Sequence, residues 1–324
     1  MSPPTGACSP AVRGTFIANL VAQVGILVTG AVVRLTGSGL GCPTWPQCTE
    51  GSYTPTARQP EAWHKYIEFG NRLLTFVLVI LAIAAVVAAW WDRRDRRRSG
   101  RPVRPVIMLL ALIPIIGTVA QAVLGGITVL TGLHPVTVSA HFLLSMAIVA
   151  GVVALVVRSG DPGDQPITAL VPRLVSSLAW ALVVVSAVLV VLGVLVTGSG
   201  PHSGDAKSEN RFSFDPRTIS WLHADVVLLF LGLAIGLLVA LIVIGAPKPA
   251  IRRTWLLLGI AGVQGALGYV QYFSGLPGAL VAIHVLGSGL VWVTVLFIPP
   301  ALRLRGVVTM ETFSESVQER VDRH

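Results

Sequence analysis

The sequence predicts an all-α integral membrane protein of eight transmembrane helices. The helices are expected to form two tandem four-helix bundles, related by a pseudo-twofold axis along the membrane normal. Composition, apolar runs and an internal repeat support this prediction. Of the 324 residues, 53% are hydrophobic and 12% are charged, whereas soluble domains carry about 25% charged residues. The mean hydropathy is +0.76.

Each of the eight apolar runs is long enough to cross the hydrocarbon core of a bilayer as a helix. The first run does not have the short apolar core and small-residue cleavage site of a signal peptide, so we expect it to be retained as a helix. The runs are roughly 16–35, 67–91, 106–130, 136–158, 174–197, 220–244, 254–274 and 278–300.

The net charge of +9 is unevenly distributed along the chain. The segment Asp92–Pro105 holds seven arginines, and further basic residues follow the fourth, sixth and eighth runs. These segments all lie on one face of the membrane, which the positive-inside rule makes cytoplasmic together with both termini. A basic patch for nucleic acid is the competing interpretation, but the alternation with apolar runs disfavours it, and we expect no nucleic-acid partner.

An internal repeat divides the chain into halves. GILVTG at 25–30 reappears as GVLVTG at 193–198, and Gln121–Leu143 aligns without gaps on Gln264–Leu286 with eight of 23 positions identical. A repeat of four helices returns the chain to its starting side, so both halves have the same orientation. We expect an N-terminal half at 1–158, a cytoplasmic linker at 159–173, a C-terminal half at 174–305 and a cytoplasmic tail at 306–324.

Two cysteines occupy the first loop on the expected outer face. Cys42 and Cys48 lie in GCPTWPQC, and five intervening residues with two prolines can bring the sulfurs together. A disulfide is possible there because this face is oxidising. Two free thiols or a metal pair are the alternatives. Cys8 is expected to be a reduced thiol on the cytoplasmic side.

Three histidines lie within apolar runs, at a depth of roughly 5–9 Å below the outer face. They are His141, His223 and His284. Imidazoles at matched depth on facing helices can ligate a haem iron, and His223 and His284 form such a pair in the second half. Structural or proton-relay histidines are the alternative. Of the other histidines, His134 and His202 are expected in solvated loops and His64 at the interface.

The repeat shows where the halves differ. Aligning IEFGNR at 67–72 on ISWLHA at 219–224 places Asn71 over His223 and Glu68 over Ser220. Glu68 and Arg72 are four residues apart and therefore adjacent on a helix. A structural ion pair is the simplest interpretation. However, a scaffold pair would be expected in both halves, so its absence from the second half suggests that the first half performs chemistry and the second holds a cofactor.

These features together resemble the heme A synthase family over residues 14–300. The resemblance rests on LTGSGLGCPTWPQC, on the TGL–P–H pattern of 131–141 and on IHVLGSG at 283–289. It also includes the outer cysteine pair, the glutamate near the start of the second helix and the histidines of the fourth, sixth and eighth helices.

The resemblance implies an oxidoreductase in a bacterial cell (inner) membrane, which converts haem O to haem A for terminal oxidases. It oxidises the methyl at ring position 8 to a formyl group with water-derived oxygen. By this resemblance His223 and His284 ligate a haem b cofactor, His141 faces the substrate haem and Glu68 is the catalytic carboxylate. The cysteine pair is then structural, or redox-active with a partner. A haem O synthase (a farnesyltransferase), a quinone or other electron acceptor, membrane lipid and a second copy of the chain are the partners considered.

One position departs from the family pattern, which places a histidine three residues after this glutamate. Here that position is Asn71, which is a poor iron ligand. We expect His141 alone to hold the substrate iron, with Asn71 and Arg72 nearby and a water or an open position opposite. Substitution by His64, or a changed function of this half, are the alternatives.

Two other functions compete with catalysis. A non-catalytic bis-His membrane cytochrome would relay electrons and would not need Glu68. A transporter would also use internal repeats, but its polar groups would lie near the midplane. In this chain the polar groups cluster at one end of the helices.

Overall fold

The computed structural model describes residues 6–202, 204 and 210–305, so the predicted tail at 306–324 lies outside the described residues. Within them, eight helices are long and apolar enough to cross a membrane, which confirms the predicted spans. The helices are α1 Pro10–Leu35, α2 His64–Arg98, α3 Pro105–Leu130, α4 Pro135–Gly160, α5 Arg173–Ser199, α6 Pro216–Val243, α7 Lys248–Phe273 and α8 Gly278–Leu296. A short 3₁₀ helix, Pro299–Leu302, and two three-residue strands, β1 Ile167–Ala169 and β2 Arg303–Arg305, complete the described elements.

Several helices begin before their apolar run does, because polar residues cap them. Asp215 accepts hydrogen bonds from the backbone N–H (2.8 Å) and the hydroxyl (2.7 Å) of Thr218, and Pro216 occupies the first helical position. α6 therefore begins four residues earlier than the apolar pattern predicts. α2 extends in the other direction, through the arginine cluster to Arg98.

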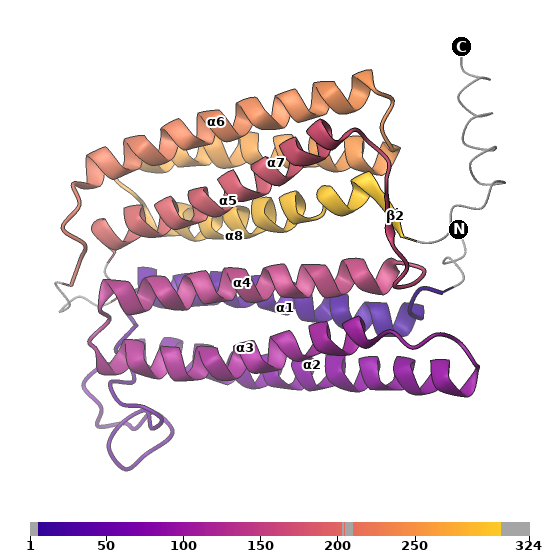
Figure 1. Cartoon of the computed structure of the whole chain (residues 1–324). Helices are drawn as coiled ribbons and strands as arrows, with labels where there is room; N and C mark the ends of the chain where they lie inside the picture. The colour runs from indigo at the N-terminus through magenta and orange to yellow at the C-terminus, as the bar shows by residue number, and fades with distance from the viewer. Residues whose placement is uncertain (1–5, 203, 205–209, 306–324) are drawn as a thin grey trace.

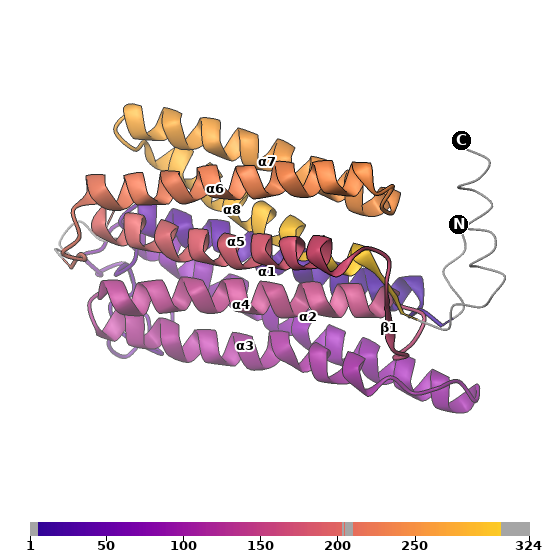
Figure 2. The same ribbon diagram turned by 45° about the horizontal axis from the view of Figure 1, so that its top comes forward.

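The helices pack in two groups of four (Figures 1 and 2). α1 packs on α2, α2 on α3, α3 on α4, and α4 on α1; α5–α8 form a second ring in the same order. In each ring the second and fourth helices are therefore diagonal neighbours. Across the groups, α8 contacts α1 and α4, and α4 contacts α5. A twofold axis that exchanges α1 with α5 and α4 with α8 would generate these same contacts, but the axis itself stays a prediction.

One apolar core runs through both groups. Its cross-group contact includes a hydrogen bond from the indole Nε1 of Trp292 in α8 to the carbonyl oxygen of Met146 in α4, at 2.9 Å. Since both groups of this bond are buried in an apolar environment, leaving either without a partner would be costly. This bond therefore fixes α8 against α4.

The two ends of the bundle differ. The arginine end, on the right of Figure 1, holds the connections 99–104, 161–172 and 244–247. There β1 pairs antiparallel with β2, a pairing that the sequence did not predict. Ion pairs join Arg158 to Asp161 (2.6 Å) and Arg104 to Asp164 (3.2 Å), which fastens the 159–173 linker to the start of α3.

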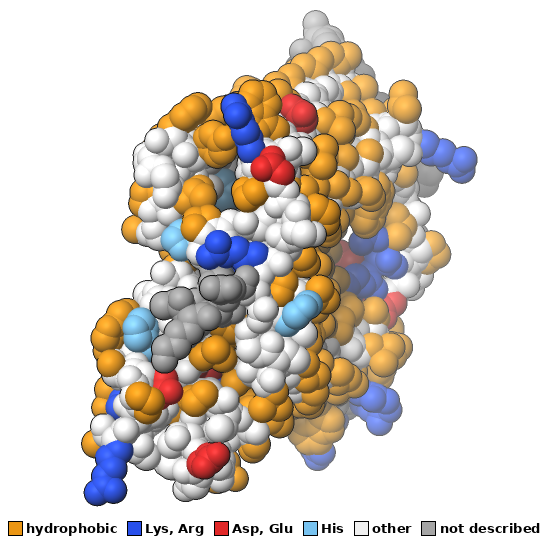
Figure 3. All heavy atoms as spheres, turned by 90° about the vertical axis from the view of Figure 1, so that its left-hand side faces the viewer, with side chains coloured by type: hydrophobic (Ala, Val, Ile, Leu, Met, Phe, Trp, Pro, Cys, Tyr) orange, Lys and Arg blue, Asp and Glu red, His pale blue; other side chains and the backbone are white. Residues whose placement is uncertain are grey.

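The loop end, on the left of Figure 1, holds residues 36–63, 131–134, 200–202, 204, 210–215 and 274–277. Figure 3 looks onto this end, where charged and histidine side chains lie scattered among hydrophobic ones. The histidines predicted as ligands, Glu68 and both loop cysteines all belong to this end of the molecule. The candidate site is therefore built here.

Candidate functional site

Four positions lie at nearly the same depth below the loop end. Each is six or seven residues after the first residue of a helix that begins there, which places it about 9–10.5 Å along the axis. The depths match more closely than the sequence predicts, because α6 begins earlier. The positions are Asn71 in α2, His141 in α4, His223 in α6 and His284 in α8.

A glutamine fixes the backbone at two of these histidines. Gln121 Nε2 in α3 donates a 2.9 Å hydrogen bond to the carbonyl oxygen of His141. Gln264 Nε2 in α7 donates a 2.9 Å hydrogen bond to the carbonyl oxygen of His284. The repeated glutamine therefore makes the same contact in both halves, and each helix that carries a histidine is held at that turn by its neighbour.

Each of the three imidazoles packs against a glycine on the preceding helix. A β-carbon at Gly125 would crowd the ring of His141, whereas one at Gly193 or Gly268 would make ordinary van der Waals contact with its histidine. The distances from such a carbon to the imidazole Cε1 would be 3.2 Å for Gly125 and His141, 3.6 Å for Gly193 and His223, and 3.4 Å for Gly268 and His284.

The three imidazoles share one further feature. The Nδ1 atoms of His141, His223 and His284 are buried and have no hydrogen-bond partner among the described residues, although an unpaired buried polar atom is costly. His223 and His284 lie on the diagonal helices α6 and α8 of the second ring. A haem needs at most two axial side chains. This is compatible with the lack of any larger cluster of metal-binding side chains in the described part of the chain.

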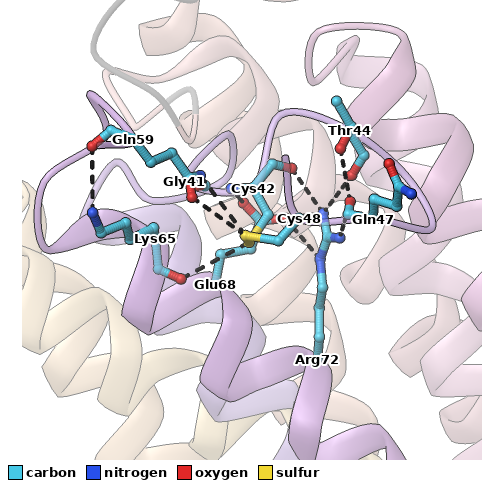
Figure 4. A network of polar contacts seen from close by, with 9 residues as sticks. All are labelled: Gly41, Cys42, Thr44, Gln47, Cys48, Gln59, Lys65, Glu68 and Arg72. Atoms are coloured by element: carbon cyan, nitrogen blue, oxygen red, sulfur yellow. Dashed lines mark hydrogen bonds and ion pairs between the residues drawn. A yellow bond between two sulfur atoms is a disulfide. The ribbon is translucent and has the colours of Figure 1, made fainter. Parts of the chain in front are cut away.

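Glu68 and Arg72 form an ion pair as their spacing predicts, with 2.6 Å between Arg72 Nη2 and Glu68 Oε1 (Figure 4). The other carboxylate oxygen accepts a 2.6 Å hydrogen bond from the backbone N–H of Cys42. Only 5% of Glu68 is exposed. Both oxygens of the predicted catalytic carboxylate are therefore bound, one to its own helix and one to the cysteine loop.

Arg72 points from α2 into the loop and binds its backbone (Figure 4). Its Nη2 donates to the carbonyl oxygens of Cys42 (2.8 Å) and Thr44 (3.1 Å), and its Nη1 donates to that of Gln47 (3.1 Å). The predicted Cys42–Cys48 disulfide is confirmed and closes this loop, which rules out free thiols or a metal pair there. We call residues 41–48 the disulfide loop; Arg72 and Glu68 anchor it to α2.

Sequence reasoning missed further anchors of the loop region. Lys65 Nζ donates to the carbonyl oxygen of Thr56 at 2.7 Å, and Gln59 Nε2 donates to that of Gly41 at 2.7 Å. Both side chains are buried. No local sequence signal identifies them, because their partners depend on the path of the loop.

Two of the remaining histidines have defined partners. His64 is the first residue of α2; its Nδ1 lies 3.0 Å from Ser38 Oγ, and its ring stacks on Trp63. The prediction that His202 is simply solvated is wrong. Its Nε2 lies 2.9 Å from the carbonyl oxygen of Leu276, and its own carbonyl oxygen accepts a 2.7 Å hydrogen bond from Arg34 Nε. His202 thus joins the loop after α5 to α1 and to the turn before α8.

Comparison with known proteins agrees with this arrangement. Residues 14–202 match the sequence profile of COX15-CtaA, described as cytochrome oxidase assembly protein. Over 55 residues the chain is 36% identical to the heme A synthase of Geobacillus kaustophilus (strain HTA426) and 34% identical to that of Geobacillus thermodenitrificans. Each alignment covers 17% of this chain and 16% of the relative, so the chain spans about a sixth of the length of these curated relatives. Because the family profile covers more than half of its 324 residues, this multi-pass membrane chain belongs to the COX15-CtaA family of cytochrome oxidase assembly proteins.

Proposed function

We propose that this protein is a heme A synthase, an oxidoreductase that converts the methyl group at ring position 8 of haem O to a formyl group. The haem A produced would serve the assembly of terminal oxidases. The overall change adds one water to the methyl carbon and releases four protons and four electrons. The electrons would pass to a quinone or another acceptor. The main support is the set of imidazoles at matched depth, in a chain of this family whose halves differ in a buried carboxylate.

The second half would hold haem b between His223 and His284. When bound, this group supplies one-electron transfer. The surrounding residues would orient it: Gln264 holds the backbone of His284, and the rings of His223 and His284 pack beside Gly193 and Gly268 of the neighbouring helices.

The first half would bind haem O through His141, which is held by Gln121 as His284 is held by Gln264. Glu68 would be the catalytic carboxylate, which takes a proton from water or stabilises positive charge beside the methyl carbon. It precedes Asn71 by three residues and so lies near the same face of α2. Since Glu68 also binds the N–H of Cys42, the disulfide loop would position the carboxylate.

The expected surroundings follow from this proposal. The protein would lie in a bacterial inner membrane with both termini in the cytoplasm, since basic residues gather at the arginine end. Its haem O would come from a haem O synthase. A second copy of the chain and membrane lipid remain proposed partners.

Expression in a host that makes haem O but no haem A tests the proposal. Haems extracted from the membranes are separated and identified by mass. The wild-type chain is expected to produce haem A, Glu68→Gln none, and Glu50→Gln the wild-type amount, because Glu50 is an exposed carboxylate close to the same loop. Absence of haem A with the wild-type chain would refute the function. Production by Glu68→Gln would refute the catalytic assignment of Glu68 while leaving the enzymatic function standing.

The cofactor is tested separately by a reduced-minus-oxidised spectrum of the purified protein. A haem b signal is expected for the wild type and should be lost in the His223→Ala, His284→Ala double variant. A signal that survives in the double variant would show that other residues hold the haem.

A further inference from the structure

Position 71 breaks a pattern that the other three positions share. His141, His223 and His284 each face a glycine on the preceding helix. Gly25 in α1 is the repeat equivalent of Gly193, so its partner on α2 should be the equivalent of His223, which is Asn71. The first half therefore has the glycine, Gly25, but has Asn71 in place of the imidazole ring that should face it.

The space for the ring remains open. A β-carbon at Gly25 would meet nothing within 4 Å, whereas one at Gly193 would lie 3.6 Å from His223. Gly25 is also exposed, while Gly193 is partly buried. A glycine within a helix costs about 1 kcal/mol relative to alanine, and no packing contact in the described structure requires one at position 25.

Asn71 supplies a polar atom with no described partner. Its Oδ1 is buried and accepts no hydrogen bond within the described residues, which is unfavourable unless a donor reaches it from a bound molecule. His64 does not fill the gap. It lies seven residues earlier on α2, about 10.5 Å along the axis, and its ring is held by Ser38 and Trp63.

We propose that the first half carries a small-ligand site between Gly25 and Asn71, at an open axial position opposite His141. In the resting protein it would hold a water molecule that donates a hydrogen bond to Asn71 Oδ1. The site has room for a neutral nitrogen ligand of the size of the missing ring, so it should also take added imidazole. This inference rests on the proposed function, because it requires a haem bound by His141.

The test uses the full chain, purified with its haem b and titrated with haem O until the first half is saturated. Imidazole is then added to the ferric protein, and the visible spectrum and spin state are followed. We expect a high-spin first-half haem that turns low-spin on binding one imidazole per chain, with the haem b signal unchanged. Asn71→His should be low-spin before any addition and should lose imidazole binding.

Two further variants keep the test independent of Asn71→His. Asn71→Leu should stay high-spin and still bind imidazole, which excludes the amide itself as the iron ligand. Gly25→Val should fold, because its side chain meets open space, and should weaken imidazole binding roughly tenfold or more. Unchanged imidazole affinity in Gly25→Val would overturn the placement of the site.

The outcomes separate this inference from the proposed function. A wild-type protein that makes haem A, but whose first-half haem is low-spin and does not bind imidazole, would overturn the open site alone. A wild-type protein that makes no haem A and takes up no haem in the first half would overturn both.

Discussion

Replacing Arg72 with methionine should release the disulfide loop without unfolding the helices. Methionine keeps most of the length of the side chain but removes the guanidinium that binds Glu68 and three carbonyl oxygens of the loop. The carboxylate would then be left buried with a single donor, the N–H of Cys42. The other remaining link to α2 would be Lys65, which binds the carbonyl oxygens of Thr56 and Gln59, while Gln59 in turn binds that of Gly41.

The size of the effect follows from burial. Removing one partner of a buried ion pair costs roughly 3–5 kcal/mol, and since 23% of the Arg72 side chain is exposed, we take the lower value of about 3 kcal/mol. Each 1.4 kcal/mol changes an equilibrium constant by a factor of ten. The open state of the loop should therefore be populated about a hundredfold more often than in the wild type. Cys42 and Cys48 are fully buried, at 0% exposure, so a reductant can reach the disulfide only when the loop opens.

Reduction kinetics measure this opening. The protein in detergent is treated with a water-soluble phosphine, quenched with a thiol label, and the Cys42 and Cys48 peptides are quantified by mass spectrometry. Arg72→Met should be reduced about a hundredfold faster than the wild type, as the opening population predicts. Arg217→Met, which removes an exposed arginine of α6, should match the wild type. Equal rates for all three proteins would show that Arg72 does not hold the loop closed.

Three further predictions concern other parts of the chain. Burial raises the pKa of the Cys8 thiol from 9.0 to about 11. The folded protein therefore keeps this proton to a higher pH than the unfolded chain, and the free energy of unfolding should fall as the pH rises from 9 towards 11. Maleimide labelling of Cys8 at pH 8 should accordingly be much slower in the folded protein than in denaturant, and equal rates would contradict its burial. Gln264→Leu should alter the haem b spectrum. Gln121→Leu should leave that spectrum unchanged and weaken haem O binding. The reverse pattern would exchange the proposed roles of the two halves. Trp292→Phe should cost about 1 kcal/mol in a reversible unfolding measurement, because it removes the hydrogen bond that the indole donates to the Met146 carbonyl oxygen. An unchanged stability would show that this bond does not fix α8 to α4.

The spans could be predicted from the sequence because hydrocarbon leaves the backbone few alternatives to a helix. All eight apolar runs are helical. The helix ends were less predictable, since they depend on caps such as Asp215 and on charged extensions such as the end of α2. The depth of His223 was underestimated for this reason.

The candidate site was only partly predictable. The spacing of Glu68 and Arg72 determines that they are neighbours, because positions four apart share a helix face. The carbonyl partners of Arg72 follow from the path of a loop that lies far away in sequence, and no periodicity encodes that path. The same reason applies to the pairing of β1 with β2, two three-residue strands more than a hundred residues apart.

The repeat explains why the two proposed haem sites would be close together. His141 lies on α4 and His284 on α8, and these two helices pack on each other across the halves, with Trp292 bonded to Met146. Both histidines are held at the same turn by equivalent glutamines. A repeated four-helix unit therefore places two histidines, the proposed haem ligands, at equal depth on adjacent helices. The chemical difference between the halves then needs only the turn of α2 that carries Glu68, Asn71 and Arg72. Under the proposed function, a change in that turn would alter the reaction while the proposed electron path between the two haem sites stayed the same.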